Sequence, residues 1–418
     1  MQHSGNYLHK SNIKIDAQMT MKEKLKQLLL TKFHAVERQK YDLTDAVVSR
    51  GVRAYALLDF NSLKQELLEY MRKQEVAPYA YKYAASREKT CLYASIYAVM
   101  LEGLLGTLQV RGKKDLKGWA DYLNSFQNEE DGLYYDPVLT GPSYEHIGQW
   151  NEGWGKHHLM GHMIIALARL GATPKYPLRY LEAYYDHESL MEWMDSFDFS
   201  GDVWTASNYF MNLYTVMEYA RDYMNDKRAG DAIQTMIEWI MKKQNQETGM
   251  WHTQSFSSLD QLGKLKVVRA AYHFYPLFEY EGADIPYADK IVETILPLQN
   301  RWGGWTVEEG NAGACEDIDA IEPIIRCAAA RPELTTQIKA AVKRSMIWQL
   351  SCRNDDKGFS FYLRAQQEYG GHPLTTSLRD ESSMFATWFR TLCLAYEMRY
   401  LGMDNGFDIG RFPGYEIS

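Results

Sequence analysis

Cysteine is scarce in this chain, and the arrangement of its copies excludes two common frameworks. The five residues are odd in number, widely spaced and form no Cys-x-x-Cys pair: Cys91, Cys315, Cys327, Cys352 and Cys393. Neither a disulfide framework nor a structural zinc site is indicated by such a pattern. We therefore expect no metal and no other cofactor.

Long apolar runs are also missing. The first residues, MQHSGNYLHKSNIKID, are too polar for the core of a signal peptide, and the longest apolar stretch, residues 91–109, contains Ser95, Glu102 and Gly106. We expect a cytoplasmic protein without stable membrane insertion, in which this stretch is a buried helix.

An excess of positive charge is absent as well. The chain has 46 Lys and Arg against 54 Asp and Glu, a net charge of −8, which argues against nucleic acid as a partner. What the chain has in abundance is aromatic side chains: 30 Tyr, 15 Phe and 11 Trp. Such side chains suit the lining of a ligand cavity as well as a core.

A repeated pattern of glutamine, glycine and an aromatic residue organises the 418 residues. Three clear copies are Gln127 with Gly132 and Tyr134, Gln244 with Gly249 and Trp251, and Gln299 with Gly304 and Trp305. A looser copy runs from Gln349 to Gly358 and Phe359, and a degenerate one contains Gly201 and Trp204. Each copy follows an amphipathic segment with apolar residues three and four apart, which predicts that the glycine ends a helix and the aromatic residue turns back onto it.

After each loop comes a second helical segment that is apolar nearly all round, as expected of a helix buried on most sides. We predict inner helices near Arg87–Leu105, Lys156–Leu170, Ala206–Arg221, Lys264–Tyr280, Glu316–Ala330 and Asp380–Tyr400. Their amphipathic outer partners are predicted near Ser62–Arg72, Leu116–Gln127, Leu178–Trp193, Asp231–Gln244, Ala288–Gln299 and Thr335–Gln349.

Six outer-inner pairs predict an all-α fold, an (α/α)6 barrel or toroid, over residues 61–418. An open helical solenoid is the alternative, but it would leave terminal apolar faces that need caps, so six pairs favour closure. Residues 1–60 are predicted to form a polar arm and a helix near Met21–Arg38. The Gly-, Pro-, Ser- and Tyr-containing segment between Tyr134 and Trp154 is a candidate lid.

If the inner helices all run the same way, their N-termini meet at one mouth of the barrel, where free N–H groups favour anionic groups. Glu316, Asp317 and Asp319 place three carboxylates at the start of one inner helix. Such groups, packed together and partly desolvated, do not all ionise easily, so one of them is expected to act as an acid near neutral pH. The alternative is that they are ordinary partners of the helix dipole.

The repeats and the segment LQNRWGGWTVEEGNAGACEDIDAIEPII resemble the terpenoid cyclase and protein prenyltransferase toroids, and the likeness is greatest to class II terpene cyclases such as squalene-hopene cyclase. In those enzymes a Gln-x-x-Gly-Gly-Trp loop precedes an Asp-x-Asp-Asp motif. Here Asp317-Ile318-Asp319-Ala320 follows Trp305, so the motif's last Asp is replaced by Ala320. The resemblance implies that Asp319 protonates an alkene and that Asp317 orients it.

The zinc prenyltransferases, the other branch of this superfamily, hold their metal with Asp, Cys and His. Cys315 and Asp317 match part of that set, but the stretch Asp380–Phe389, where the histidine belongs, contains none. His158 and His162 also have metal-like spacing, yet Leu159 stands where a zinc protease has its glutamate. We interpret these two histidines as packed side chains and His157, nearer the mouth, as the candidate for acid–base chemistry.

The remaining candidates for substrate binding share positions in or beside the predicted mouth. They are Trp154, Trp204, Asn208, Tyr209, Arg269, Trp305, Arg379 and Trp388. The aromatic rings suit cationic intermediates in a cyclase and sugar faces in a glycan enzyme. Their alternative role is packing of the loops against the helices.

The leading functional hypothesis is protonation-initiated cyclisation or isomerisation of an isoprenoid-like substrate in the central cavity. Its main alternative is a lyase, hydrolase or epimerase acting on an acidic glycan, with His157, Tyr209 and a carboxylate as base and acid, and Arg269 or Arg379 among the cations that hold uronate groups. The second alternative is a non-catalytic helical scaffold. The partner is thus a small molecule or an oligosaccharide, and the sequence leaves the oligomeric state open.

Overall fold

The computed structural model describes residues 45–141, 143–145, 153–197, 199–200, 203–307, 310–403 and 406–418. Contacts divide the chain into two units, Met1–Lys40 and Tyr41–Ser418, and all described residues belong to the second. The helix predicted near Met21–Arg38 lies outside the described residues. None of the helices described is long and apolar enough to cross a bilayer.

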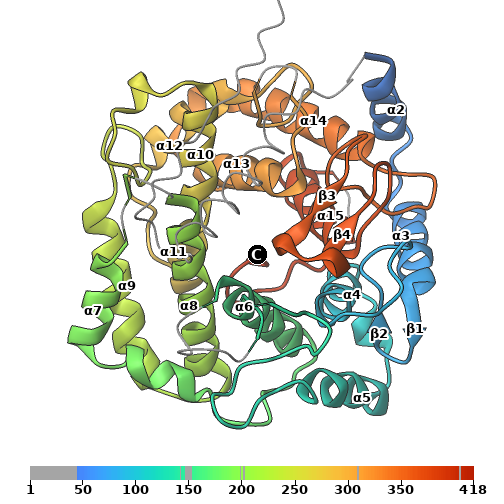
Figure 1. Ribbon diagram of the computed structural model, residues 1–418. Coiled ribbons are helices and arrows are strands. Elements are labelled where there is room, and N and C mark those ends of the chain that lie inside the picture. Colours follow the sequence, from blue (N-terminus) through green and yellow to red (C-terminus); the bar gives the residue numbers. More distant parts are fainter. Residues whose placement is uncertain are drawn as a thin grey trace, which may run out of the picture. The chain divides into compact units, whose positions relative to one another are not determined.

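The described unit is an (α/α)6 toroid, as the sequence predicted (Figure 1). The inner helices are α4 (Leu92–Leu104), α6 (Trp154–Arg169), α8 (Val203–Tyr223), α10 (Gln261–Tyr272) continued by α11 (Tyr275–Glu281), α13 (Ala314–Cys327) and α15 (Met384–Tyr400). The outer helices are α3 (Phe60–Gln74), α5 (Lys113–Asn124), α7 (His187–Asp195), α9 (Arg228–Lys243), α12 (Ala288–Ile295) and α14 (Thr335–Ser351). An additional helix, α2 (Asp45–Ala56), packs against α14.

The inner ring is closed. Each inner helix packs against the next one along the chain, and the last, α15, packs against the first, α4. Where the ring closes, the Met384 N–H donates a hydrogen bond of 2.8 Å to the Tyr83 carbonyl, and the rings of Tyr97 and Trp388 stack 5.5 Å apart. Closure excludes the open solenoid.

Burial explains the two kinds of helix. Every residue of α4 is buried, whereas α9 buries only one stripe, with Ile233, Met236, Ile237 and Ile240 in it. A buried side chain of this size contributes about 1.5–3 kcal/mol relative to an exposed one. Two inner-ring neighbours and an outer helix therefore accommodate an inner helix that is apolar all round.

Two predicted helices are each divided in the structure. The segment Lys264–Tyr280 breaks between α10 and α11 at His273 and Phe274, because Pro276 has no N–H to continue the helix and instead begins the next one. The segment Leu178–Trp193 divides into a 3₁₀ stretch, Arg179–Tyr184, and α7. Two short antiparallel pairs, β1 (Glu75–Ala77) with β2 (Ala80–Tyr81) and β3 (Gln367–Glu368) with β4 (Thr376–Ser377), lie in loops.

The repeated glutamines fasten each loop to the next outer segment. The Gln244 amide donates to the carbonyls of Gly249, in its own loop, at 2.8 Å and of Pro286, before α12, at 3.1 Å. The other two clear copies do the same: Gln127 donates to Gly132 and Tyr176, and Gln299 to Gly303 and Ala341. The aromatic residue of the repeat bonds back to the preceding helix: Trp251 Nε1 donates a hydrogen bond of 2.8 Å to the Ile240 carbonyl of α9.

At Gly249, both the backbone conformation and the close packing of neighbouring atoms require glycine in the repeat. Gly249 has a φ of +71°, and a Cβ at this position would lie 2.5 Å from the Ile291 side chain. The repeat thus sets the spacing between neighbouring outer segments. The looser copy differs, since the Gln349 side chain accepts a hydrogen bond from Arg390.

Replacing Gln244 by Ala should destabilise the toroid by about 1–3 kcal/mol, because two carbonyls lose their partner in a largely buried place. The free energy of unfolding in urea measures the effect. Gln234→Ala, an exposed position on the same helix, is the matched control. Equal stability of the two variants would contradict a fastening role for the repeat.

Candidate functional site

The N-terminal ends of the inner helices lie at one end of the ring, and polar side chains converge below them. Two contacts show this. The rings of Trp154 and Trp204, at the starts of α6 and α8, are 6.3 Å apart, and the Met384 N–H at the start of α15 donates to the Tyr83 carbonyl in the loop before α4. Two groups of side chains lie on different inner helices of the ring and the loops beside them. We call them the acidic group (Arg269, Glu316, Asp319 and Tyr362) and the histidine group (Tyr93, Tyr97, His158, His162 and Tyr369).

Glu316 is the centre of the acidic group. It lies in the first turn of α13 and is 7% exposed. Its Oε1 accepts a hydrogen bond of 3.2 Å from the Tyr362 hydroxyl and lies 3.5 Å from the Arg269 guanidinium of α10. Its Oε2 is buried and has no hydrogen-bond partner among the described residues, so a carboxylate oxygen remains available for a ligand.

Asp319 lies three residues further along α13, and helical geometry places positions three apart on one face. It is 2% exposed. Burial raises the pKa of Asp319 well above the usual value, and the charge of Glu316 adds to this effect. Burial therefore favours the protonated form of Asp319, which lies near a carboxylate accompanied by Arg269.

Asp317 faces away from this pair and has a different role. It is fully buried; its Oδ2 accepts hydrogen bonds from Trp348 Nε1 of α14 at 2.8 Å and from Arg390 of α15 at 3.0 Å, and its Oδ1 accepts from the Trp305 N–H. Burial raises the pKa of Asp317 to about 6, although Arg390 acts in the opposite direction. These bonds hold α13, α14 and α15 together, and they leave Asp317 without the orienting role that the resemblance implied.

The histidine group is a chain of hydrogen bonds between α4, α6 and the loop after β3. His158 lies between two hydroxyls, with Tyr93 2.7 Å from Nδ1 and Tyr369 3.0 Å from Nε2, and the Tyr97 hydroxyl donates to that of Tyr369. Burial lowers the pKa of His158 well below its usual value and raises that of Tyr369. The imidazole is therefore neutral, and the phenol is protonated.

His162 lies one turn below His158. Its Nδ1 is 2.9 Å from the His158 carbonyl, and burial lowers its pKa to about 4. Its Nε2 is buried without a hydrogen-bond partner among the described residues. Both histidines are packed side chains, as we predicted from the sequence, and they lie inside the ring.

Several predicted substrate-binding residues lie beside these groups. Trp154 stacks on His158 with ring centroids 4.3 Å apart, and its Nε1 has no partner among the described residues. Asn208 donates to the Trp204 carbonyl. The ring of His157 lies 5.8 Å from that of Tyr180 and 6.3 Å from that of Tyr209, between α6 and its outer neighbour.

Two other predicted residues, Trp305 and Arg379, lie elsewhere, whereas the ring of Trp388 stacks on that of Tyr97 in the histidine group. Trp305 and Trp388 are core side chains, whose indole N–H groups donate to the Ile295 carbonyl and to Glu416. Arg379 is 63% exposed and pairs with Asp380. Tyr362 and Tyr369, which sequence reasoning missed, come from a loop without regular helix or strand pattern, so only the abundance of tyrosine pointed to them.

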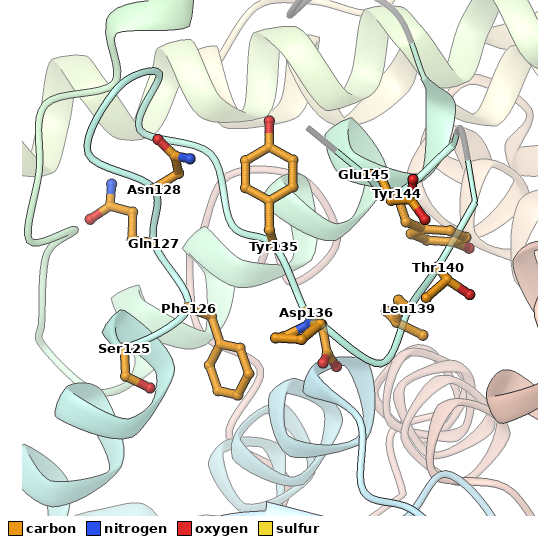
Figure 2. A pocket seen from close by; sticks show the side chains of 11 residues that line it. Ser125, Phe126, Gln127, Asn128, Tyr135, Asp136, Leu139, Thr140, Tyr144 and Glu145 are labelled. Atoms are coloured by element: carbon orange, nitrogen blue, oxygen red, sulfur yellow. The ribbon is translucent and has the colours of Figure 1, made fainter. Parts of the chain in front are cut away.

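An open pocket of about 480 Å³ adjoins the histidine group. Figure 2 shows Tyr135 between the Gln127–Asn128 pair and the Tyr144–Glu145 pair. The ring of Tyr144 meets that of Tyr93 edge to face, 6.3 Å apart, and its hydroxyl donates to the Gly370 carbonyl. The pocket is lined by residues 125–128 and by residues of the predicted lid segment between 135 and 145, and it offers rings, amides and two carboxylates to a ligand.

In the described part of the chain, no group of three or more His, Cys, Asp or Glu side chains could hold a metal ion. The cysteines described are all free.

Comparison with known proteins gives likenesses of fold only. No protein-family model and no curated protein matches the sequence. A polysaccharide lyase matches at 12% identity with a TM-score of 0.45, over 81% of this chain and 98% of its own. A GH76 α-mannanase of Bacteroides thetaiotaomicron matches at 11% identity with a TM-score of 0.41, over 85% of this chain and 100% of its own. A protein from Actinoplanes matches at 12% identity with the same TM-score, over 82% and 100%.

The resemblance to terpenoid cyclases, and the cyclisation it implied, are wrong. The two matching structures whose names give an activity are a polysaccharide lyase and an α-mannanase, and neither is a terpene cyclase. The physical reason lies in the repeats: their glutamines, glycines and aromatic residues fasten the helices of the toroid, and Asp317 of the motif is bound to Arg390 and Trp348. The sequence repeat shared with terpenoid cyclases thus indicates the toroid architecture and does not indicate the reaction.

The two aspartates should respond in opposite ways to conversion to asparagine. Asp317→Asn leaves the buried Arg390 charge without its partner and should cost about 3–5 kcal/mol. Asp319→Asn should match the wild type near pH 4 and become the more stable protein as pH rises, because the raised pKa of Asp319 makes the wild type lose stability between the unfolded and folded pKa values. Urea unfolding at several pH values measures both; a pH-independent difference for Asp319→Asn would contradict the assignment.

Proposed function

We propose that the protein is an enzyme that hydrolyses a glycosidic bond, with Asp319 as the acid and Glu316 as the base. The observation that supports this is the pairing on one face of α13 of a carboxyl kept neutral by burial and a carboxylate accompanied by Arg269. Glycoside hydrolases usually use a pair of carboxyl groups whose environments differ.

The roles follow from the two environments. Asp319 donates its proton to the glycosidic oxygen as the bond to the sugar carbon breaks, and the free Oε2 of Glu316 accepts a proton from the attacking water. Arg269 and Tyr362 hold the Glu316 side chain in place. The two carboxyl groups then exchange protons with solvent to restore the starting state.

The surroundings suit a sugar. Trp154 and Trp204 offer ring faces beside the histidine group, and Tyr135 and Tyr144 offer them in the open pocket. Buried polar atoms without partners among the described residues, at Trp154 Nε1 and His162 Nε2, suit the hydroxyls of a carbohydrate.

A second candidate, β-elimination in an acidic glycan, is favoured by the histidine group. A neutral His158 is suited to remove the proton next to a uronate carboxyl group, and a protonated Tyr369 is suited to donate one to the leaving oxygen. Hydrolysis is preferred because both nitrogens of His158 already lie within hydrogen-bond distance of hydroxyls, whereas Glu316 has a free oxygen.

The purified protein should release reducing ends from members of a panel of neutral and acidic oligosaccharides. Asp319→Asn and Glu316→Gln should each lower kcat by about 100-fold or more with a small change in KM, since each removes one proton-transfer step. Glu238→Gln, an exposed position on outer helix α9, should keep full activity.

The nature of the product decides between the candidates. An unsaturated product with its own ultraviolet absorbance, formed by Glu316→Gln but not by His158→Ala, would select elimination. Full turnover by Asp319→Asn would reject the proposed acid.

A further inference from the structure

The C-terminal tail, residues 406–418, lies inside the ring. Figure 1 shows the C-terminus at the centre of the six inner helices. The chain leaves α15 at the end opposite the helix N-termini and then enters the ring, where Tyr415, Glu416 and Ile417 are buried.

The tail contacts every inner segment of the ring. The Asp408 N–H donates to the Leu104 carbonyl of α4, and Gly414 lies against Ile165 of α6 and Thr215 of α8. Arg411 donates to the Tyr280 carbonyl of α11, Arg326 of α13 donates to the Ile417 carbonyl, and the Tyr396 hydroxyl of α15 donates to the Tyr415 carbonyl.

Glu416 fixes the tail in this position. It is fully buried, accepts a hydrogen bond of 2.9 Å from Trp388 Nε1, and pairs with Arg169, whose Nε lies 2.7 Å from Oε2. A buried ion pair of this kind is costly to break, because either partner alone would be an uncompensated charge. The tail is therefore a permanent part of the ring.

Tyr415 is the tail residue nearest to the candidate site. Its ring lies 4.9 Å from that of His162, 5.8 Å from that of Trp388 and 6.5 Å from that of Tyr272, so it touches three sides of the ring at once. Tyr272 lies one turn beyond Arg269 on α10, so Tyr415 also lies close to the acidic group.

From this geometry we infer that Tyr415 forms the closed end of the site, so that a glycan enters from the helix N-termini only and presents a chain end to Glu316 and Asp319. This inference rests on the proposed function. A bond in the middle of a long chain needs an exit on both sides of the reacting atoms, and the tail occupies the ring beside His162 of α6 and Tyr272 of α10. The substrate class is therefore the terminal unit of a glycan, with the rest of the chain leaving toward the open pocket that contains Tyr135 and Tyr144.

The test compares Tyr415→Ala, which removes the closed end, with Tyr415→Phe, which keeps the ring. On a linear oligosaccharide labelled at one end, the wild type and Tyr415→Phe should shorten the chain stepwise from a single end. Tyr415→Ala should release internal fragments in addition. Internal fragments from the wild type at the earliest times, or identical products from both variants, would overturn the inference and leave the hydrolytic function intact.

A second measurement needs no glycan. Cys315 lies next to Glu316 in the first turn of α13 and is only partly buried, whereas Cys91, Cys327, Cys352 and Cys393 are buried. Alkylation by iodoacetamide, mapped by mass spectrometry, should be about fivefold or more faster at Cys315 in Tyr415→Ala than in Tyr415→Phe, because labelling follows access. The buried cysteines should stay unreactive, which also shows that the variant is folded. Equal Cys315 rates in the two variants would show that the tail does not close the site, whether or not the protein cleaves glycans.

Discussion

Closure of the inner ring allows every inner helix to be buried on all sides. Inner helices such as α4 are apolar on all sides, and only a ring gives each of them two inner neighbours and an outer one. The contact of α15 with α4, with its hydrogen bond from Met384 to Tyr83, provides the last of these neighbours. Closure also brings together side chains far apart in sequence, such as Arg269 in the last turn of α10 and Glu316 in the first turn of α13.

The fold was predictable because its signals are local. The repeat of glutamine, glycine and an aromatic residue spans a single loop, and its hydrogen bonds, such as those from Gln244 to Gly249 and Pro286, depend on that spacing. The same repeat led to the wrong prediction of a terpene cyclase. Residues that fasten the helices of a toroid do not indicate which reaction takes place inside it. The break of one predicted inner helix at His273 was readable in principle from Pro276.

The site was only partly predictable, for geometric reasons. Positions two apart on a helix face different ways, so Asp317 points to Trp348 and Arg390 while Asp319 points to the acidic group. Helical spacing pairs Asp319 with Glu316, whereas the resemblance paired it with Asp317. The tyrosines that complete the two groups, Tyr362 and Tyr369, come from an irregular loop, which no periodicity reveals.

If the proposed function holds, a sugar binds between the acidic and histidine groups, beside one face of α13. A crystal structure of Asp319→Asn soaked with an oligosaccharide would show where the sugar binds. A sugar ring should lie within hydrogen-bond distance of Glu316 Oε2 and the residue 319 amide. A sugar bound solely on the outer helices, with Glu316 and residue 319 untouched, would contradict it.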